Sequence, residues 1–220
     1  MAQTAVSAQV EEYLEAMCRI RDRGDLTTLT ALARELRVAP PSVLGMIHRM
    51  VEQELVMYTR RTGAVLTAHG QLVASRLRRR HRLAERLLTD LLAIPWARAH
   101  EIACRFEHVI DEEVEPYLLA ALDHPTTCPH GNPLNGDGDE TLCPLSELAV
   151  GQAGRVLCIL DESAPLLEYL TELHLQPDAW VVVHAAAPFG GPLTLDVAGE
   201  RVALAREVAQ HLLVAPEVGR

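Results

Sequence analysis

The short stretch HEIACRFEH, residues 100–108, contains a set of four side chains that together could bind a metal ion. They are those of His100, Cys104, Glu107 and His108. Imidazole, thiolate and carboxylate groups are the usual protein ligands of divalent transition metals. A helix turns by 100° per residue, so these positions fall within an arc of about 100° on one face. The stretch therefore predicts a metal site. The alternative is a half-buried helix with an ion pair and two structural histidines.

Two further groups of donor residues occur elsewhere in the chain. His81 and Glu85 stand four residues apart, one turn along a helix, so both can face one ion. An ordinary salt bridge is the alternative for this pair. Cys128, His130 and Cys143 lie in a segment rich in proline and glycine. They indicate a separate zinc site only weakly, because the paired Cys-x-x-Cys spacing of structural zinc sites is missing.

The charge is divided unevenly along the chain. The net charge is −10, yet residues 19–98 hold fifteen arginines against seven aspartates and glutamates. The chain contains no lysine, so every basic side chain is an arginine. A basic segment joined to an acidic one indicates a polyanionic partner, such as a nucleic acid, better than the overall charge does. Plain solvated helix faces are the alternative.

The first part of the chain has the pattern of a winged helix-turn-helix. Apolar residues at helical spacing predict three helices, over residues 7–22, 29–36 and 42–55. Thr28 or Thr30 can cap the second helix, and Ser42 opens the third, because proline is tolerated only at the start of a helix. Two short apolar runs around an Arg-Arg-Thr-Gly turn predict a β-hairpin over residues 56–67.

Two long helices and a small barrel are predicted after the hairpin. Residues 68–93 fit one amphipathic helix, which Pro95 and Trp96 end, and residues 97–122 fit another. Residues 124–144 are rich in Pro, Gly, Asn and Asp and mark a boundary. Short apolar runs then predict the strands of a β-barrel, over residues 154–160, 180–187, 192–199 and 200–206. The predicted fold class is mainly α with β.

The bulk composition favours a cytoplasmic protein without a membrane partner. No stretch is apolar over the length of a membrane span, and the N-terminus has neither the basic start nor the hydrophobic segment of a secretory signal. Five cysteines, an odd number at scattered spacings, argue against a disulfide framework and leave thiolates for a metal.

The motifs together resemble the diphtheria-toxin-repressor family of metal-dependent transcriptional repressors. The resemblance covers nearly the whole chain and rests on EEYLEAMCRI, VAPPSVLGMIHRM, GAVLTAHG, RRHRLAERLL, HEIACRFEHVIDEEVE and CPHGNPL. It implies repression through double-stranded DNA, as a homodimer, with metal uptake genes as targets. We expect three domains: a winged helix-turn-helix over residues 1–74, a helical dimerisation and metal-binding domain over 75–143, and a Src-homology-3-like barrel over 146–220.

The resemblance implies a primary metal site coupled to DNA binding. Cys104, Glu107 and His108 match three of its ligands, and Glu12 stands at the position of the fourth. Iron sensors of the family typically have methionine at that fourth position, whereas manganese sensors have a carboxylate. Manganese sensors usually have glutamate where this chain has Cys104, so the site is a hybrid. Manganese(II) is favoured, with iron(II) as the alternative.

An ancillary site is also implied, which gives two cations per subunit. His81, Glu85 and His100 match its ligands, and Glu162 is the nearest candidate for a ligand from the barrel. The loop that contains Cys128 and His130 corresponds to a structural loop in the family.

DNA contact is expected from the start of the third helix and from the hairpin tip. The helix should enter the major groove, and the arginines of the turn should reach the phosphates. The candidates are Ala39, Pro40, Pro41, Ser42, Gly45, His48, Arg60 and Arg61. A hydrolytic metal centre is the distant alternative, and the sequence has no HExxH motif, nucleophile elbow or phosphate loop to favour it.

Overall fold

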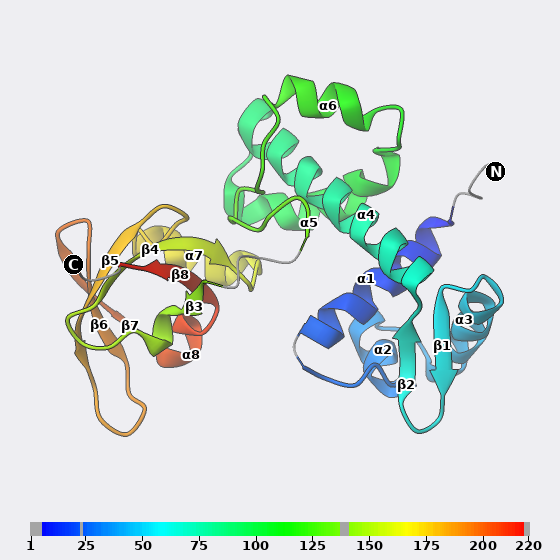
Figure 1. The fold of residues 1–220 in the computed structure, drawn as a ribbon, viewed down its shortest axis with the longest axis horizontal. Helices are drawn as coiled ribbons and strands as arrows, with labels where there is room; N and C mark the ends of the chain where they lie inside the picture. Colours follow the sequence, from blue (N-terminus) through cyan, green and yellow to red (C-terminus); the bar gives the residue numbers. More distant parts are fainter. Residues whose placement is uncertain (1–5, 23, 137–140, 218–220) are drawn as a thin grey trace. The chain divides into compact units, whose positions relative to one another are not determined.

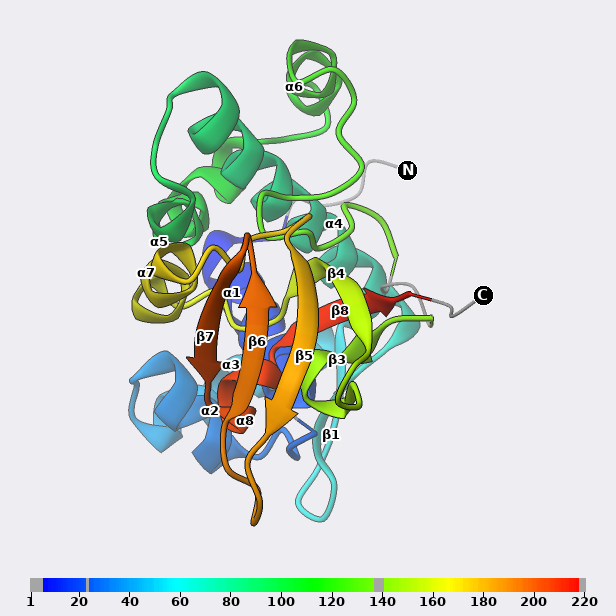
Figure 2. The ribbon, with the colours of Figure 1, turned by 90° about the vertical axis from the view of Figure 1, so that its left-hand side faces the viewer.

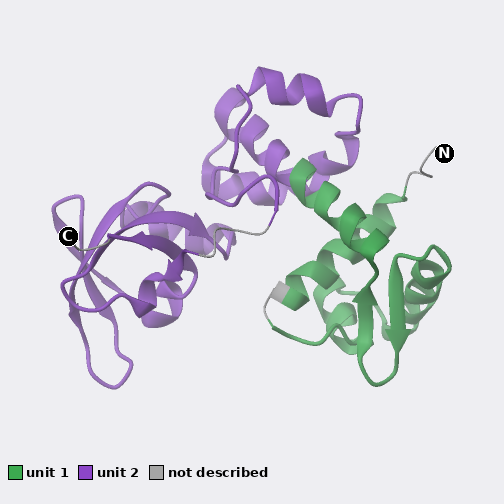
Figure 3. Cartoon of the chain, viewed as in Figure 1, with its two compact units in different colours: residues 1–80 green, residues 81–220 purple. Residues whose placement is uncertain are grey.

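The computed structural model describes residues 6–22, 24–136 and 141–217. Contacts divide the chain into two compact units, residues 1–80 and 81–220, which Figure 3 colours separately. The boundary falls inside helix α4 (Ala68–Arg86), so this helix begins in the first unit and ends in the second.

Three helices open the first unit, as the periodicity predicts (Figure 1). They are α1 (Ala8–Asp22), α2 (Leu29–Leu36) and α3 (Pro40–Glu52). The Thr28 hydroxyl accepts a hydrogen bond from the Ala31 amide at 3.1 Å and so caps α2. Helix α3 begins at Pro40, so the predicted start at Ser42 was two residues late. Proline fits the first helical positions because their amides have no partner within the helix.

The predicted hairpin is confirmed and forms the wing. Strand β1 (Val56–Thr59) pairs antiparallel with β2 (Gly63–Leu66). The amide of Ala64 donates to the carbonyl of Thr27 at 2.8 Å, which ties the wing to the loop before α2. Gly63 has a φ of +76°, and a Cβ there would lie 2.4 Å from the same carbonyl oxygen. Only glycine fits this close approach.

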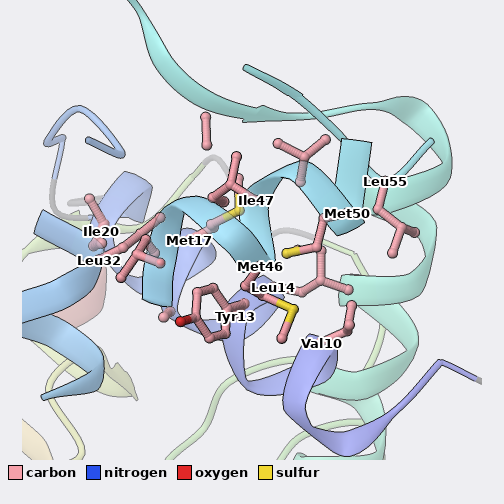
Figure 4. Packing of buried hydrophobic residues seen from close by; sticks show 14 of the residues in the cluster. Val10, Tyr13, Leu14, Met17, Ile20, Leu32, Met46, Ile47, Met50 and Leu55 are labelled. Carbon is pink, nitrogen blue, oxygen red and sulfur yellow. The ribbon is translucent and has the colours of Figure 1, made fainter. Parts of the chain in front are cut away.

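One hydrophobic core serves the first unit (Figure 4). Side chains from all three helices and from the start of the hairpin meet in it. Its largest fully buried members are Leu14, Ile20, Leu32, Ile47, Met50 and Leu55. Burial of an aliphatic side chain of this size contributes about 1.5–3 kcal/mol. The core therefore fixes one face of α3 and leaves the other to solvent.

Helix α4 continues into a π-helical turn over Leu87–Leu91. The helical path predicted over residues 68–93 is thus largely confirmed, with a widened last turn. A Cβ at Gly70 would lie 2.0 Å from the carbonyl oxygen of Leu55, so a glycine is needed where α4 starts. Neither α4 nor any other helix of the described residues has the length and apolar character that crossing a membrane requires.

The single helix predicted over residues 97–122 is wrong. The segment forms α5 (Trp96–Phe106), a 3-10 turn (Glu107–Val109) and α6 (Glu115–Ala121). The backbone is extended at Ile110, where the helical path ends. The Asp111 carboxylate then accepts hydrogen bonds from the amides of Glu113 and Val114, both at 2.9 Å, and so closes the turn that precedes α6.

A six-stranded antiparallel sheet forms the C-terminal part of the second unit, in the order β3-β8-β4-β5-β6-β7. Figure 2 shows β5, β6 and β7 side by side. The strands are β3 (Cys143–Pro144), β4 (Ala153–Ile159), β5 (Trp180–Ala186), β6 (Leu193–Val197), β7 (Glu200–Leu204) and β8 (Leu212–Pro216). Helices α7 (Ala164–Glu172) and α8 (Arg206–Ala209) accompany them. Register shifts after Val156 and Val183 mark β-bulges, which bend a strand. The four predicted strands are confirmed, and β3 and β8 were missed.

Candidate metal centre

Helices α4 and α5 and the loop after β4 bring four predicted donor residues together. On α4, the Nε2 atom of His81 lies 3.1 Å from Oε1 of Glu85. On α5, Nδ1 of His100 lies 3.2 Å from the same oxygen. Glu162, between β4 and α7, reaches His100 Nδ1 with its Oε2 atom at 2.7 Å. One ligand atom from each residue lies within 4.8 Å of the others, a spacing suited to one cation.

Cys128 and His130 add two candidate metal ligands, although the family resemblance implies a structural role for their loop. Ligand atoms of Glu85, Cys128, His130 and Glu162 also lie within 4.8 Å of one another. His130 Nδ1 is 3.4 Å from Glu85 Oε1 and 3.5 Å from Glu162 Oε1. Cys143, in β3, joins no such group among the described residues. The two sets share both carboxylates. We name the six residues the ancillary cluster: His81, Glu85, His100, Cys128, His130 and Glu162.

Arginines of α4 fix the loop that carries Cys128. Arg86 donates from Nε to the carbonyl of Thr127 at 2.7 Å and from Nη2 to the carbonyl of Cys128 at 3.2 Å. Arg82, one turn earlier, donates to the carbonyl of Pro133. Helix α4 therefore carries two candidate metal ligands, His81 and Glu85. Its arginines also hold the loop that carries two more, Cys128 and His130.

A backbone carbonyl orients the ring of His130. Its Nε2 atom donates to the carbonyl of Trp96 at 3.0 Å, so Nδ1 faces Glu85 and Glu162. Metal-ligating histidines commonly donate their other ring nitrogen to such a carbonyl. Burial alone would lower the pKa of His130, but a hydrogen bond with Glu85 raises it. His130 is thus arranged to bind through Nδ1 once that nitrogen loses its proton.

The surroundings of Glu85 fit the binding of a cation in the ancillary cluster. Its side chain is fully buried, and its Oε2 atom has no hydrogen-bond partner among the described residues. A buried polar atom without a partner is costly. Burial alone would raise the pKa of Glu85, but hydrogen bonds from three histidines lower it well below its usual value. An ionised carboxylate with a free oxygen, surrounded by nitrogen and sulfur donors, suits a divalent transition metal.

The carboxylates raise the pKa values of the histidines in turn. Burial would lower the pKa of His100, but hydrogen bonds with Glu162 and Glu85 raise it to about 10. Burial would likewise lower the pKa of His81, but hydrogen bonds with Cys104, Glu107 and Glu85 raise it well above its usual value. A cation that binds these nitrogens must displace their protons, so its binding releases protons.

Cys104, Glu107 and His108 lie at and just after the end of α5, because the predicted α-helix stops before the last two of them. Cys104 belongs to α5, whereas Glu107 and His108 form the 3-10 turn. Glu107 is buried, and its Oε1 atom lies 3.6 Å from His108 Nε2. Ligand atoms of Cys104, His81 and His100 lie within 4.8 Å of one another, and His81 Nδ1 is 2.5 Å from Glu107 Oε2. His81 therefore contacts both predicted donor sets.

Glu12 lies in the first unit. It is exposed on α1, whereas its neighbours Val10, Tyr13 and Leu14 on that helix are buried in the core. The other predicted primary ligands belong to the second unit. The role of Glu12 as a ligand stays a prediction.

All the predicted DNA-contacting residues are exposed. Those of α3 and its cap are Ala39, Pro40, Pro41, Ser42, Gly45 and His48. Arg60 and Arg61 are exposed between the two strands of the wing. The ring of His48 makes an edge contact with Tyr58 of β1, with the ring centroids 6.5 Å apart. A Cβ at Gly45 would meet no atom within 4 Å, so α3 presents bare backbone there.

Three family models match successive parts of the chain. "Iron dependent repressor, N-terminal DNA binding domain" matches residues 5–64, and "Iron dependent repressor, metal binding and dimerisation domain" matches residues 67–135. "FeoA domain" matches residues 143–216. The matches follow the order of the wing unit, the donor-bearing helices and the six-stranded sheet.

Whole proteins and solved structures agree with these matches. The iron-dependent repressor IdeR of Mycobacterium tuberculosis is 32% identical over 93% of this chain and 95% of its own length. The diphtheria toxin repressor of Corynebacterium jeikeium is 37% identical over 57% of this chain and 52% of its own. A solved structure of a manganese-dependent transcriptional repressor in complex with manganese has a TM-score of 0.83 and 25% identity, covering 93% of this chain and 98% of that one. The chain therefore belongs to the diphtheria-toxin-repressor family of metal-dependent transcriptional repressors.

Proposed function

We propose that the protein is a manganese-responsive repressor that acts in the cytoplasm and controls genes of manganese and iron homeostasis. The observation that carries the choice of manganese is the presence of two carboxylates, Glu12 and Glu107, in the predicted primary site. Carboxylate oxygens suit manganese(II), whereas thioether and thiolate ligands select softer ions. The similarity to a manganese-dependent repressor over 93% of the chain supports this choice.

Iron(II) is the second candidate. Cys104 would add a soft thiolate to the primary site, and a relative named iron-dependent is 32% identical over nearly its full length. The hydrolytic alternative falls, because the chain belongs to a family of repressors and its relatives are not enzymes.

Each subunit would bind two cations. Glu12, Cys104, Glu107 and His108 would hold the primary one, and residues of the ancillary cluster would hold the other. A divalent cation supplies positive charge that neutralises the carboxylates of each site. The protein's own part is to bring donors from separate elements within reach of one ion, as the arginines of α4 do for Cys128.

DNA binding would use the exposed face of α3 and the wing. The residues from Ala39 to His48 would enter the major groove, and Arg60 and Arg61 would contact phosphates. A homodimer presents two such helices to two half-sites, and their spacing must fit the helical repeat of DNA. The match to a family model described as a dimerisation domain supports the homodimer.

Metal and DNA would be linked through the primary ligands. Glu12 belongs to the unit that carries α3, and Cys104, Glu107 and His108 belong to the other unit. Ligands drawn from both units favour one arrangement of the recognition helices in the dimer. The cation thus binds the DNA-competent state more tightly, and DNA must raise the metal affinity by the same factor.

A promoter-reporter assay in cells supplied with manganese or iron separately tests the proposal, with Glu12→Met as the paired variant. We expect repression by manganese in the native protein and a shift of the response toward iron in the variant, because methionine replaces a hard ligand by a soft one. His108→Ala should abolish metal-dependent repression while the fold persists. Repression by iron alone, unchanged in Glu12→Met, would overturn the manganese assignment. Full metal-dependent operator binding by His108→Ala would overturn the primary site.

A further inference from the structure

Asn132 is buried beside the ancillary cluster, in the loop between α6 and β3, and both polar atoms of its side chain are paired. Its Nδ2 atom donates to Oε1 of Glu162 at 2.6 Å and to the carbonyl of Ile159 at 2.9 Å. Its Oδ1 atom accepts from the Cys158 thiol at 2.8 Å. These partners fix the orientation of the amide, because the carboxylate and the carbonyl need a donor and the thiol supplies one.

The bonds of Asn132 lie at a joint between the loop and strand β4. The amide of Ile159 donates to the carbonyl of His130 at 2.9 Å, beside the side-chain bond from Asn132 to the carbonyl of the same Ile159. Gly131, with a φ of +85°, lies so close that a Cβ would be 1.7 Å from the carbonyl oxygen of Leu157. That leucine is the residue at the β-bulge of β4. Backbone and side-chain contacts therefore hold the loop and the strand together.

Each oxygen of Glu162 has a separate role at this joint. Oε1 accepts from Asn132 and lies near His130, while Oε2 lies 2.7 Å from His100 Nδ1. Glu162 sits on the short connection between β4 and α7, where a glutamate side chain without partners would sample several rotamers. An amide is a neutral donor with no charge to compete for a cation. It can therefore orient the carboxylate without reducing its charge.

We propose that Asn132 is a positioning residue, which holds the Glu162 carboxylate in the orientation that the ancillary cluster needs. The proposal rests on the proposed function, since it takes the cluster to be a cation site. Groups that orient metal ligands in this way typically change metal affinity by 10–100-fold when they are removed. The Cys158 thiol donates to the amide oxygen of Asn132, whereas the bond to Glu162 comes from the amide nitrogen.

The test is calorimetric titration with manganese(II) of the full chain carrying His108→Ala, so that the ancillary site dominates the signal. In this background we expect Asn132→Ala to weaken manganese binding by tenfold or more. Cys158→Ala, the matched control, should change it less than twofold, because the bond from Asn132 to Glu162 remains. Circular dichroism checks the fold of each variant. Asn132→Gln, which keeps the amide but displaces it by one methylene, should also weaken binding and serves if the alanine variant does not fold.

A double-mutant cycle separates positioning from a merely structural role. If Asn132 acts through Glu162, then Asn132→Ala should have no further effect on manganese affinity in a chain that carries Glu162→Ala. An equal loss in both backgrounds, or a loss of less than twofold in the single variant, would overturn the proposal. If Glu162→Ala and His100→Ala both left manganese affinity unchanged, the ancillary site itself would be wrong, and this inference would fall with it. Failure of the inference alone would leave the effects of those two variants intact.

Discussion

Gly45 lies inside α3, where a glycine is unfavourable for the helix itself. Glycine in a helix interior costs roughly 0.5–1 kcal/mol relative to alanine, because it loses more backbone freedom on folding. Its φ is not positive, and no atom lies within 4 Å of the place where a Cβ would be. The fold of the first unit therefore does not require glycine here. A close approach of DNA to the backbone, as proposed for α3, would account for it.

Gly45→Ala should separate stability from DNA binding. The free energy of unfolding should rise by about 0.5–1 kcal/mol, because alanine is the better helix former. Operator affinity should fall, because the added methyl group occupies the face that we assign to the major groove. Thermal unfolding and fluorescence anisotropy with operator DNA measure the two effects. A more stable variant that bound DNA as tightly as the native protein would remove α3 from the interface at this position.

Some candidate metal ligands can be predicted from the neighbouring residues in the sequence, and others cannot. His81 and Glu85 are predictable because four residues make one helical turn, and the structure has them 3.1 Å apart on α4. Glu162 has no such signal, since its place depends on the contact between β4 and a loop about thirty residues earlier in the chain. Cys128 and His130 form a visible pair of donors in the sequence. Their carboxylate partners are distant in sequence, so the pair alone indicates no site.

The loop between α6 and β3 supplies Cys128 and His130 to the ancillary cluster and packs against β4. Gly131 lets it pass within contact distance of β4, and any side chain there meets the carbonyl of Leu157. Gly131→Ala should therefore destabilise the joint and weaken manganese binding at the ancillary cluster. Gly151→Ala is the matched control, because Gly151 has a nearly equal φ of +86° and open space around its Cβ position.

The control should show only the cost of left-handed backbone, about 1–2 kcal/mol, with unchanged metal affinity. Thermal unfolding and manganese titration of both variants provide the comparison. Equal metal affinities for the two variants would mean that contact of the loop with β4 is not needed for the ancillary cluster.

Elements held by local patterns were predictable, and those held by distant partners were not. The apolar stripe and the Thr28 cap define α2, and the short turn defines the wing. The break between α5 and α6 combines extended backbone at Ile110 with a turn closed by the Asp111 carboxylate, and neither is evident within a continuous helical pattern. Strand β3 has only two residues, and it pairs with β8 across about seventy positions of sequence. No local signal marks such a pairing.

Twelve of the twenty arginines lie in residues 1–80, the unit that carries α3 and the wing, although the net charge of the chain is −10. Arg60→Ala and Arg61→Ala should weaken binding to operator and random duplexes alike, because phosphate contacts carry no sequence information. Each change should reduce the slope of log affinity against log salt concentration by about 1. Arg201→Ala, at an exposed position on β7 beside Asp196, is the control and should leave the slope unchanged. Anisotropy titrations over a range of potassium chloride concentrations measure this slope for each variant. A loss confined to one operator base pair would contradict the phosphate assignment.

The position of β8 in the sheet limits the order in which parts of the chain can fold during synthesis. This strand lies between β3 and β4, although it comprises residues 212–216 and they lie near residues 143 and 153. The first unit needs nothing beyond residue 80 for its own core and can fold as it leaves the ribosome. Strand β4, which carries the chain into Glu162, can pair with β5 earlier, but its pairing with β8 must wait until residues 212–216 have been made. A nascent repressor therefore has a complete recognition helix well before its ancillary cluster is complete.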